Sequence, residues 1–370
     1  MNFLKTNDKI VKINEVLTSA NHKCWLVGGA VRDYLCDKTP NDYDLVTSAD
    51  PETAMKLFTD AGIKNFPMGI NHGTFVIEIE NERFEITSSH HYVNGNIIYT
   101  SNIEDDLAHR DFTINAMAMD FNGNIIDPFN GQHDLGNGIV RFVGNPIDRI
   151  TEDPLRMIRF FRFDHTFRKY EESDSDSYDV IVKNVHLLGD VSGWRLWNEL
   201  SKCLISKHSE AIIGDLRGID ILWEIGISSG DYYGDVSDFK HQNPHDSFVK
   251  YLHYSLGEGD EVLEKMMKKF EWTSRQKSRA RIIYDVISNG PSLPRLKSKI
   301  AAHNYPKKWV IEALDLMEFT DEKKKIEKWN IPVFPISETE VDSEKYAMMK
   351  CEWAESGFRL SREKLLNKVL

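Results

Sequence analysis

The sequence predicts an α/β head domain followed by an all-α neck, body and tail. The chain has 370 residues, which is enough for two or three domains with cores of their own. Short apolar runs that end in glycine or turn residues fill residues 23–120, whereas nearly every segment after about residue 145 has helical periodicity. We therefore expect an α/β head at 1–144, and a helical neck, body and tail at 145–210, 211–290 and 291–370.

Composition and charge narrow the class of protein. The chain is 41% hydrophobic and 28% charged, and no apolar run approaches the ~20 residues that span a bilayer. The first residues form an amphipathic pattern without the apolar stretch of a signal peptide, so we expect a cytoplasmic protein with no membrane partner. The net charge of 46 − 58 = −12 argues against a protein that coats nucleic acid without sequence preference. Four cysteines fit neither a zinc site nor a disulfide framework: Cys24, Cys36, Cys203 and Cys351.

The elements of the head follow from local patterns. "KCWLVGG" predicts a strand that ends in glycines, "DYDLVTS" a second strand, and "DPETAMKLFTDAG" a helix with proline near its start and glycine at its end. "GTFVIEIE" and "RFEITSS" predict a hairpin around Asn81–Glu82, and "TINAMAMDF" and "IIDPF" predict two strands joined by the turn "NGN". Helices follow, interrupted early by an acidic loop at 171–179.

The stretch "LVGGAVRDYLCDKTPNDYDLVTSADPE" combines groups that suit a phosphorylated ligand with groups that suit a metal. Gly28–Gly29 lets the backbone approach a ligand and offers N–H groups to an anion, and Arg32 on the following helix suits a polyphosphate. Asp42 and Asp44 share one face of the predicted strand, where Mg²⁺ would relieve their repulsion. Glu85 would add a third carboxylate from a neighbouring strand. Phosphate-binding groups beside paired carboxylates indicate nucleotidyl transfer.

Each of these motifs has a weaker interpretation when it stands alone. Most Gly-Gly pairs mark turns, and a lone Asp-x-Asp often lies in a surface loop. An EF-hand loop would need glycine at its sixth position, where Thr47 stands. The combination of Gly-Gly, arginine and Asp-x-Asp at this spacing is far more specific than its parts.

Four further segments complete a pattern that belongs to a known family. They are "HGTF…FEITSS", "EDDLAHRDFTINAMAMD", "DPFNGQHDLGNGIVRFVG" and "EDPLRMIRFFRF". With them the chain resembles the class II tRNA nucleotidyltransferases, the family of CCA-adding enzymes and bacterial poly(A) polymerases. The resemblance runs over residues 23–165 and continues more weakly at 191–200, 328–337 and 352–370, which are similar to the tail of eukaryotic and mitochondrial CCA-adding enzymes.

The resemblance implies an enzyme that adds CCA to the 3′ end of tRNA, using CTP, ATP and Mg²⁺ and releasing pyrophosphate. Asp42 and Asp44 would hold the metal, with Glu85 as a further catalytic carboxylate. Gly29, Arg32 and Arg110 would contact the triphosphate beside Gly28, and the motif "HRDFTIN" would recognise the ribose through Arg110, Asp111 and Asn115. The segment "EDPLRMIRFFRF" would read the base through Asp153, Arg156, Arg159 and Arg162. Neck, body and tail would grip the acceptor stem and T arm, with basic residues at 265–282 and 306–309 as candidate contacts. No protein partner is implied.

Base selection also makes chemical sense. Asp153, Arg156 and Arg159 are three residues apart and would share a helix face. Cytosine and adenine each present an amine donor beside a ring-nitrogen acceptor, which an Asp–Arg pair can match. Uracil and guanine would place a carbonyl against the carboxylate, at a cost of ~1–3 kcal/mol for the unpaired group. The plain alternative is that Asp153 caps a helix with Pro154 in its first turn, and that the arginines form a solvated stripe.

Three departures from the family leave alternatives open. His109 replaces the first of two arginines in the ribose motif, and Trp194 replaces a glutamate. The segment "TSSHHYVNGNIIYTSNIEDDL" is shorter than the family's flexible basic loop, which helps the switch from adding C to adding A, so a CC-adding enzyme is an alternative. A poly(A) polymerase would be expected to carry a strongly basic terminal tract. His245–Asp246 could belong to a metal phosphohydrolase, although a satisfied surface pair is the simpler interpretation.

Overall fold

A computed structural model describes residues 7–40, 42–93, 96–169, 174–227, 243–256 and 260–367. The chain divides into two compact units, Met1–Leu188 and Gly189–Leu370. The four-part division expected from the sequence, with boundaries at 144, 210 and 290, stays a proposal. No helix within the described residues is long and apolar enough to cross a membrane.

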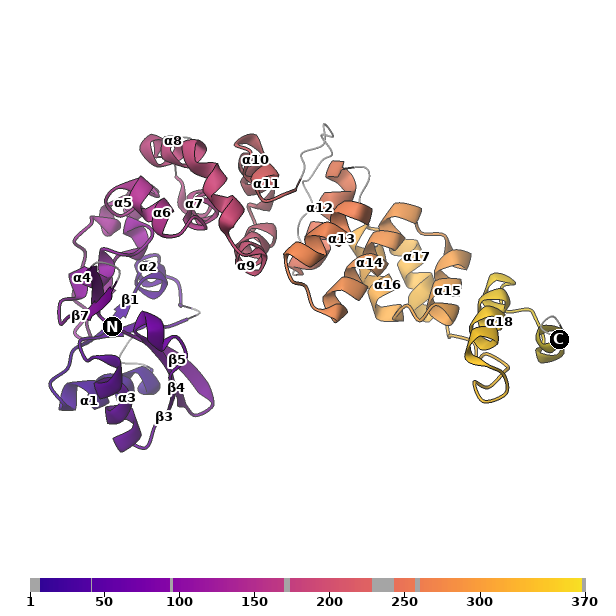
Figure 1. Cartoon of the computed structure of the whole chain (residues 1–370), viewed down its shortest axis with the longest axis horizontal. Coiled ribbons are helices and arrows are strands. Elements are labelled where there is room, and N and C mark those ends of the chain that lie inside the picture. The colour runs from indigo at the N-terminus through magenta and orange to yellow at the C-terminus, as the bar shows by residue number, and fades with distance from the viewer. Residues whose placement is uncertain are drawn as a thin grey trace. The chain divides into compact units, whose positions relative to one another are not determined.

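The first unit is built on a sheet of seven strands in the order β3-β4-β5-β2-β1-β8-β9. Figure 1 labels four of these strands, β1, β3, β4 and β5. Within the sheet β2 and β5 run parallel, with Leu45 opposite Ile86, and the other neighbours run antiparallel. The strands are β1 (Cys24–Val27), β2 (Leu45–Thr47), β3 (Lys64–Phe66), β4 (Thr74–Ile79), β5 (Glu82–Ser88), β8 (Ala118–Met119) and β9 (Ile125–Ile126). This confirms the predicted α/β head.

Helices cover the sheet as the local signals predict. Helix α3 (Pro51–Asp60) begins with Pro51 and is capped by the side chain of Asp50, which accepts the Thr53 N–H at 3.0 Å. Its Phe58 is fully buried against Phe75 of β4, with ring centroids 6.0 Å apart. Helices α1 (Asp8–Ser19) and α4 (Ile103–Leu107) and the short α2 (Gly29–Leu35) complete this layer of elements.

The predicted hairpin is confirmed, and a second hairpin was missed. Strands β4 and β5 are joined through Glu80 and Asn81, whose φ values of 52° and 65° suit a tight hairpin turn. Strands β6 (His90–Val93) and β7 (Asn96–Tyr99) form a separate two-stranded sheet where a loop was expected. Asn94–Gly95 between two β-prone runs is a sequence signal that could have revealed it. The predicted strand "TINAMAMDF" was wrong at its start, because Thr113–Asn115 forms a 3₁₀ turn, η3.

The end of the first unit is helical and rests on an aromatic core. Its helices are α5 (Gly131–Asn137), α6 (Pro146–Glu152), α7 (Arg156–Phe167) and α8 (Ser175–Asn184). Phe160 of α7 lies 6.3 Å from Phe112 and 6.1 Å from Phe142, both in the head. This packing joins α7 to the sheet domain. The acidic segment 171–179 is only partly described; Asp174 caps α8, so its second half is helical rather than a loop.

The described part of the second unit is all helical, as predicted. Helix α9 carries Trp197, which packs with Trp272 at a centroid distance of 4.8 Å. After the 3₁₀ turn η4 (Val185–Asp190), the helices are α9 (Gly193–Leu204), α10 (Ser209–Gly218), α11 (Ile221–Glu224), α12 (Pro244–Leu256), α13 (Asp260–Lys269), α14 (Ser274–Asn289), α15 (Leu293–Ala302), α16 (Lys307–Leu316), α17 (Thr320–Lys328), α18 (Ser343–Glu355) and α19 (Arg362–Leu366).

Candidate active site

The turn between β1 and α2 places backbone against a guanidinium group. Gly28 has φ +68° and ψ −129°, a conformation that favours glycine. A Cβ atom at Gly28 would lie 2.6 Å from Nη1 of Arg110, so no larger residue fits without displacing that arginine. The Gly28 N–H donates to the Met117 carbonyl at 3.1 Å, which corrects the expectation that both glycine amides face an anion. Gly29 is the first residue of α2.

Three carboxylates gather where β2 begins beside the middle of β5. Asp42 and Asp44 lie just before β2 rather than on it, which corrects the predicted strand start. The Val27 N–H donates to the Asp44 carbonyl at 3.0 Å and fixes that backbone. The register that sets Leu45 opposite Ile86 brings Glu85 level with Asp44. The structure thus places Glu85 beside the aspartates, as the sequence predicted.

The electrostatics of this cluster favour a bound cation. Partial desolvation raises the pKa of Asp44; the charge of Arg110 opposes this shift and that of Asp42 adds to it. Partial desolvation and then the charge of Asp44 raise the pKa of Glu85. All three carboxylate residues remain exposed, so nearby protein, and not complete burial, causes the desolvation. Each negative charge therefore disfavours ionisation of the neighbouring carboxyl groups, and a bound divalent cation would offset that cost.

The donor set fits Mg²⁺ in an open site. Carboxylate oxygens are the hard ligands that this ion prefers, and it usually completes its shell with water and substrate phosphates. Within the described residues, no group of three or more His, Cys, Asp or Glu side chains is arranged to hold an ion by itself. Asp42 and Asp44 are the residues that would hold the metal, and phosphate oxygens would supply ligands that the chain does not.

A network of hydrogen-bonded side chains connects α2, the motif "HRDFTIN" and α7. Arg32 donates from Nη1 to Oδ1 of Asn115 at 2.5 Å, and Asn115 donates from Nδ2 to Asp111 at 3.0 Å. Asp111 in turn accepts from Nε and Nη2 of Arg159 at 2.9 and 2.5 Å. Four predicted nucleotide-binding residues, from three separate motifs, therefore form one continuous network.

The network is anchored by burial. Burial alone would raise the pKa of Asp111, but the charge of Arg159 and hydrogen bonds from Asn115, Arg159 and the Phe112 N–H outweigh it, so the pKa is lowered. The guanidinium group of Arg32 lies 5.1 Å from the ring centroid of Phe163. The carboxylate stays ionised and the arginines stay fixed in place.

The segment "EDPLR" is not one continuous helix. Asp153 lies in the break between α6 and α7 with φ −150°, and its side chain accepts the Leu155 N–H at 3.2 Å. The expectation that Asp153 shares a helix face with Arg156 and Arg159 is wrong, because Asp153 and Pro154 precede α7. The alternative that Asp153 caps the helix describes this break better, although Pro154 lies before α7 and not in its first turn.

The arginines of α7 are held by protein groups and do not form a solvated stripe. Arg156 donates to Glu152 at 2.8 Å and to the backbone carbonyls of Arg149 and His109 at 3.1 and 2.8 Å. Arg162 lies over the ring of Phe163 at 4.2 Å. Arg156 is thereby fixed close to Asp153, at the start of α7.

Comparison with known proteins shows which proteins the chain is similar to. Residues 24–141 match the family described as the Poly A polymerase head domain. The chain is 29% identical to human CCA tRNA nucleotidyltransferase 1, mitochondrial, over 96% of this chain and 88% of the relative. It is 38% identical to the CCA-adding enzyme of Lactobacillus helveticus over about half of each chain, 54% and 51%.

Over its head the chain is therefore similar to the Poly A polymerase head domain family, and over nearly its whole length to the human CCA tRNA nucleotidyltransferase. The fold extends beyond the head: the Bacillus stearothermophilus CCA-adding enzyme in complex with CTP superposes with a TM-score of 0.70 at 22% identity. That likeness covers 98% of this chain and 87% of the other.

The head contains supporting residues that sequence reasoning missed. Asp106 accepts from Nε and Nη2 of Arg110 at 3.1 and 3.0 Å and so aims that arginine at Gly28. Asp33 accepts from Nε and Nη2 of Arg32 at 3.1 and 2.8 Å. The spacing of four residues between Asp106 and Arg110 is a signal that could have found the first pair.

Two departures from the nucleotidyltransferase pattern meet in space. Tyr92 of β6 packs edge-on against His109, with centroids 5.3 Å apart and planes at 90°. Partial burial lowers the pKa of His109. The hairpin β6–β7 therefore sits directly against the residue that replaces the family's arginine.

The possible phosphohydrolase pair, His245–Asp246, has a structural role in the helical unit. Asp246 is buried and accepts from Nε and Nη2 of Arg279 at 3.0 and 2.6 Å. His245 packs between Trp197 and Trp272 at 4.8 and 4.5 Å, where burial and the charge of Arg279 lower its pKa to about 4. The expected surface pair is wrong, because Asp246 bonds an arginine inside the helical unit.

Proposed function

We infer that this chain is a nucleotidyltransferase that adds CCA to the 3′ end of tRNA without a template. The observation that supports this function most strongly is the position of Asp44. Its carboxylate interacts with the charges of Asp42 and Glu85 and also with that of Arg110, which lies against Gly28. Acidic groups for a metal and basic groups for a triphosphate thus stand side by side. The curated relatives named above carry CCA addition in their names.

The reaction is a displacement at the α-phosphorus. The terminal 3′ hydroxyl oxygen of the RNA bonds to the α-phosphorus of CTP or ATP, the bond to the β-phosphate bridging oxygen breaks, and pyrophosphate leaves with that electron pair. The hydroxyl proton passes to solvent. Mg²⁺, held by Asp42 and Asp44, would lower the pKa of the hydroxyl and stabilise the leaving group. Arg32 and Arg110 orient the triphosphate, and Glu85 adds negative charge to the cation side.

Base choice is proposed to depend on Asp153 and Arg156. The Asp153 carboxylate accepts the exocyclic amine of cytosine or adenine, and Arg156 donates to the adjacent ring nitrogen. The contacts of Arg156 with Glu152 and two backbone carbonyls support this role, since a fixed guanidinium group can reject a mismatched base. Asp111 and Asn115 face the ribose, and Arg159 and Arg162 support the base-reading segment.

One assay tests the function. Wild-type protein is incubated with Mg²⁺ and tRNA that ends before CCA, with labelled CTP alone, ATP alone, or both. We expect two C residues with CTP, and completion to CCA with both nucleotides. No incorporation under any condition overturns the proposal, and long A tails on unrelated RNA would assign poly(A) polymerase activity instead. Asp42→Ala should abolish incorporation while tRNA binding persists.

CC addition is the second candidate, and the ordered hairpin β6–β7 favours it. In place of a flexible loop between Glu85 and the ribose motif, the chain has the paired strands β6 (His90–Val93) and β7 (Asn96–Tyr99). If C is added and A is not, the enzyme is of the CC-adding type.

Two finer points belong to the same proposal. Mg²⁺ is supported by the hard oxygen ligands of Asp42 and Asp44, and replacing it with Ca²⁺ tests whether the site demands a small ion. The cytoplasm stays the predicted compartment. Cell fractionation distinguishes it from mitochondria, which the human relative carries in its name.

A further inference from the structure

The basic tracts expected to contact RNA are partly occupied by internal contacts. Arg279 pairs with Asp246 and Glu312, and Arg281 pairs with Glu264. Lys307 donates from Nζ to the backbone carbonyls of Glu327 and Trp329, each at 2.8 Å. These three side chains stabilise the helices, so they are less available for contacts with RNA.

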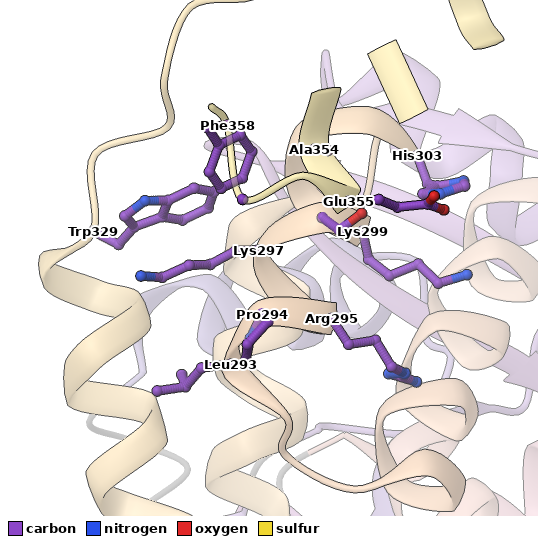
Figure 2. Close-up of a pocket in the computed structure, with 12 residues that line it drawn as sticks. Leu293, Pro294, Arg295, Lys297, Lys299, His303, Trp329, Ala354, Glu355 and Phe358 are labelled. Atoms are coloured by element: carbon purple, nitrogen blue, oxygen red, sulfur yellow. The ribbon is translucent and has the colours of Figure 1, made fainter. Parts of the chain in front are cut away.

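A cavity of about 640 Å³ in the second unit offers such groups (Figure 2). Its volume lies within the roughly 300–1,000 Å³ of small-ligand sites. It opens between α15, the residue after α17, and the end of α18. Residues that line it include Leu293, Lys297, Lys299, His303, Trp329 and Phe358.

One wall of the cavity is aromatic, with an ammonium group beside it. The ring centroids of Trp329 and Phe358 are 5.6 Å apart, at 35°. Nζ of Lys297 lies 5.3 Å from the Trp329 centroid, and Figure 2 shows the lysine extended below the indole. Both rings are only half-buried, so a planar group can reach them. Aromatic faces with a nearby cation are the means by which proteins hold unpaired nucleotides.

The backbone that presents Phe358 is strained. Gly357 and Phe358 have φ values of 70° and 66°, and the left-handed region is a marked outlier for a bulky residue. The Phe358 N–H donates to the Trp353 carbonyl at 2.9 Å, which holds the conformation. On the opposite ring, Lys307 fixes the backbone of Trp329. Strain of this kind persists where the surroundings over-determine it, and it concentrates at ligand sites.

The polar edge of the cavity is mainly cationic. Arg295 is neutralised by Asp285 at 2.9 Å, and Glu355 adds one negative charge. Lys297 and Lys299 contribute two ammonium groups, and Nζ of Lys299 lies 5.5 Å from the Tyr305 ring. A phosphate would find a positive partner here without displacing a buried ion pair.

We propose that this cavity binds one unpaired nucleotide of the RNA substrate. The base stacks on Trp329 and Phe358, and Lys297 moves from the indole to the phosphate. Stacking is tolerant of base identity, because every base has a π face. That the ligand is RNA rests on the proposed function. The cavity and its aromatic wall are observed independently of that proposal.

Binding of fluorescent tRNA without CCA to the full-length protein tests the proposal by anisotropy. Trp329→Ala should raise the Kd about fivefold or more, and Trp329→Phe should recover most of the loss. Lys297→Gln should weaken binding and lower the dependence of log Kd on log salt by about one. Val333→Ala is the matched control, since Val333 is 90% exposed, close in sequence and outside the cavity.

Several outcomes overturn the proposal. If Trp329→Ala and Lys297→Gln, each with an unchanged melting midpoint, bind tRNA as wild type does, the cavity does not hold RNA. If Trp329→Ala unfolds the tail, Lys297→Gln decides alone. If excess AMP quenches Trp329 fluorescence while neither variant changes tRNA binding, the cavity is a mononucleotide site instead. Asp42→Ala should bind tRNA normally, so failure of catalysis and failure of this inference remain distinguishable.

Discussion

At the scale of single residues, the Asp111 carboxylate ties three stretches of chain together. It accepts hydrogen bonds from Asn115, from the Phe112 N–H and from Arg159, 48 residues away. Its side chain is 8% exposed, so loss of a partner leaves a charge with little water to replace it. The residues proposed for ribose recognition and for base reading are therefore linked through the same buried carboxylate.

Arg159→Met should therefore destabilise the first unit by about 2–3 kcal/mol, because it strands a buried carboxylate. Asp111→Asn in the same background should recover part of the loss. Urea unfolding followed by circular dichroism measures both. Equal stability of Arg159→Met and wild type would contradict the role assigned to the pair.

The buried carboxylate of Asp111 also predicts that the stability of the fold depends on pH. The pKa of Asp111 is lowered on folding, so its stabilising contribution is complete above the ordinary pKa of about 4 and is lost as pH falls through the folded-state value. Wild type should lose stability more steeply than Asp111→Asn between about pH 5 and pH 2. Thermal melts across that interval provide the measurement. Parallel pH profiles would argue against a paired carboxylate.

For Asp44, one of the carboxylates proposed to hold the metal, the predicted effect of pH on stability has the opposite sign. The pKa of Asp44 is raised on folding, so its ionised form destabilises the fold at neutral pH and stability is regained as pH falls. Without metal, Asp44→Asn should raise the melting midpoint by about 1–2 °C, a gain that fades in acid. Adding MgCl₂ should raise the midpoint of wild type, and should do so less for Asp44→Asn. A variant that Mg²⁺ stabilises as much as wild type would remove Asp44 from the metal site.

At the scale of elements, the β1–α2 turn depends on one glycine of the pair. Gly28→Ala should cost about 1–2 kcal/mol of stability through its φ of +68°, and displacement of Arg110 should lower incorporation of CMP at least tenfold. Gly29→Ala is the control, because its Cβ would meet the nearest atom, Nη2 of Arg32, at 3.4 Å. Incorporation assays and melts on both variants check the contrast. Equal effects at both positions would contradict it.

Elements with strong local signals were predictable, and short or long-range features were not. Helix α3 is marked by Asp50–Pro51 at its start, and the β4–β5 hairpin by alternating apolar residues. Strand β3 has three residues with no alternation to detect, and its place at the sheet edge comes from pairing with β4. Tertiary pairing decides such segments.

The candidate site also contains some features that the sequence could predict and others that it could not. The set of Asp42, Asp44 and Glu85 could be predicted because neighbouring strands bring them to one edge. The Asp111–Arg159 bond could not, since spacing along the chain does not reveal which buried acid meets which arginine. The break at Asp153 was missed because "EDPLRMIRFFRF" carries helical periodicity on both sides of it.

At the scale of the whole molecule, the chain separates into Met1–Leu188 and Gly189–Leu370. Every residue proposed for catalysis and nucleotide choice lies in the first unit, and the proposed RNA cavity lies in the second. Each unit has a core of its own, around Phe112 and Phe160 in one and around Trp197 and Trp272 in the other.

A fragment of residues 1–188 should therefore unfold cooperatively and bind CTP with an affinity similar to that of the full chain. It should bind tRNA far more weakly, because the second unit is missing. Isothermal titration with CTP and anisotropy with tRNA measure the two affinities. A fragment that holds tRNA as tightly as the whole protein would place RNA recognition in the first unit.

The division near residue 188 also shapes how such a protein can change over generations. On the proposed assignment of sites, mutations that alter which nucleotide is added would fall in one half of the gene, and mutations that alter which RNA is held would fall in the other. Selection can act on either half with little effect on its counterpart. Recombination close to this joint could attach the same chemistry to a new RNA target in a single event.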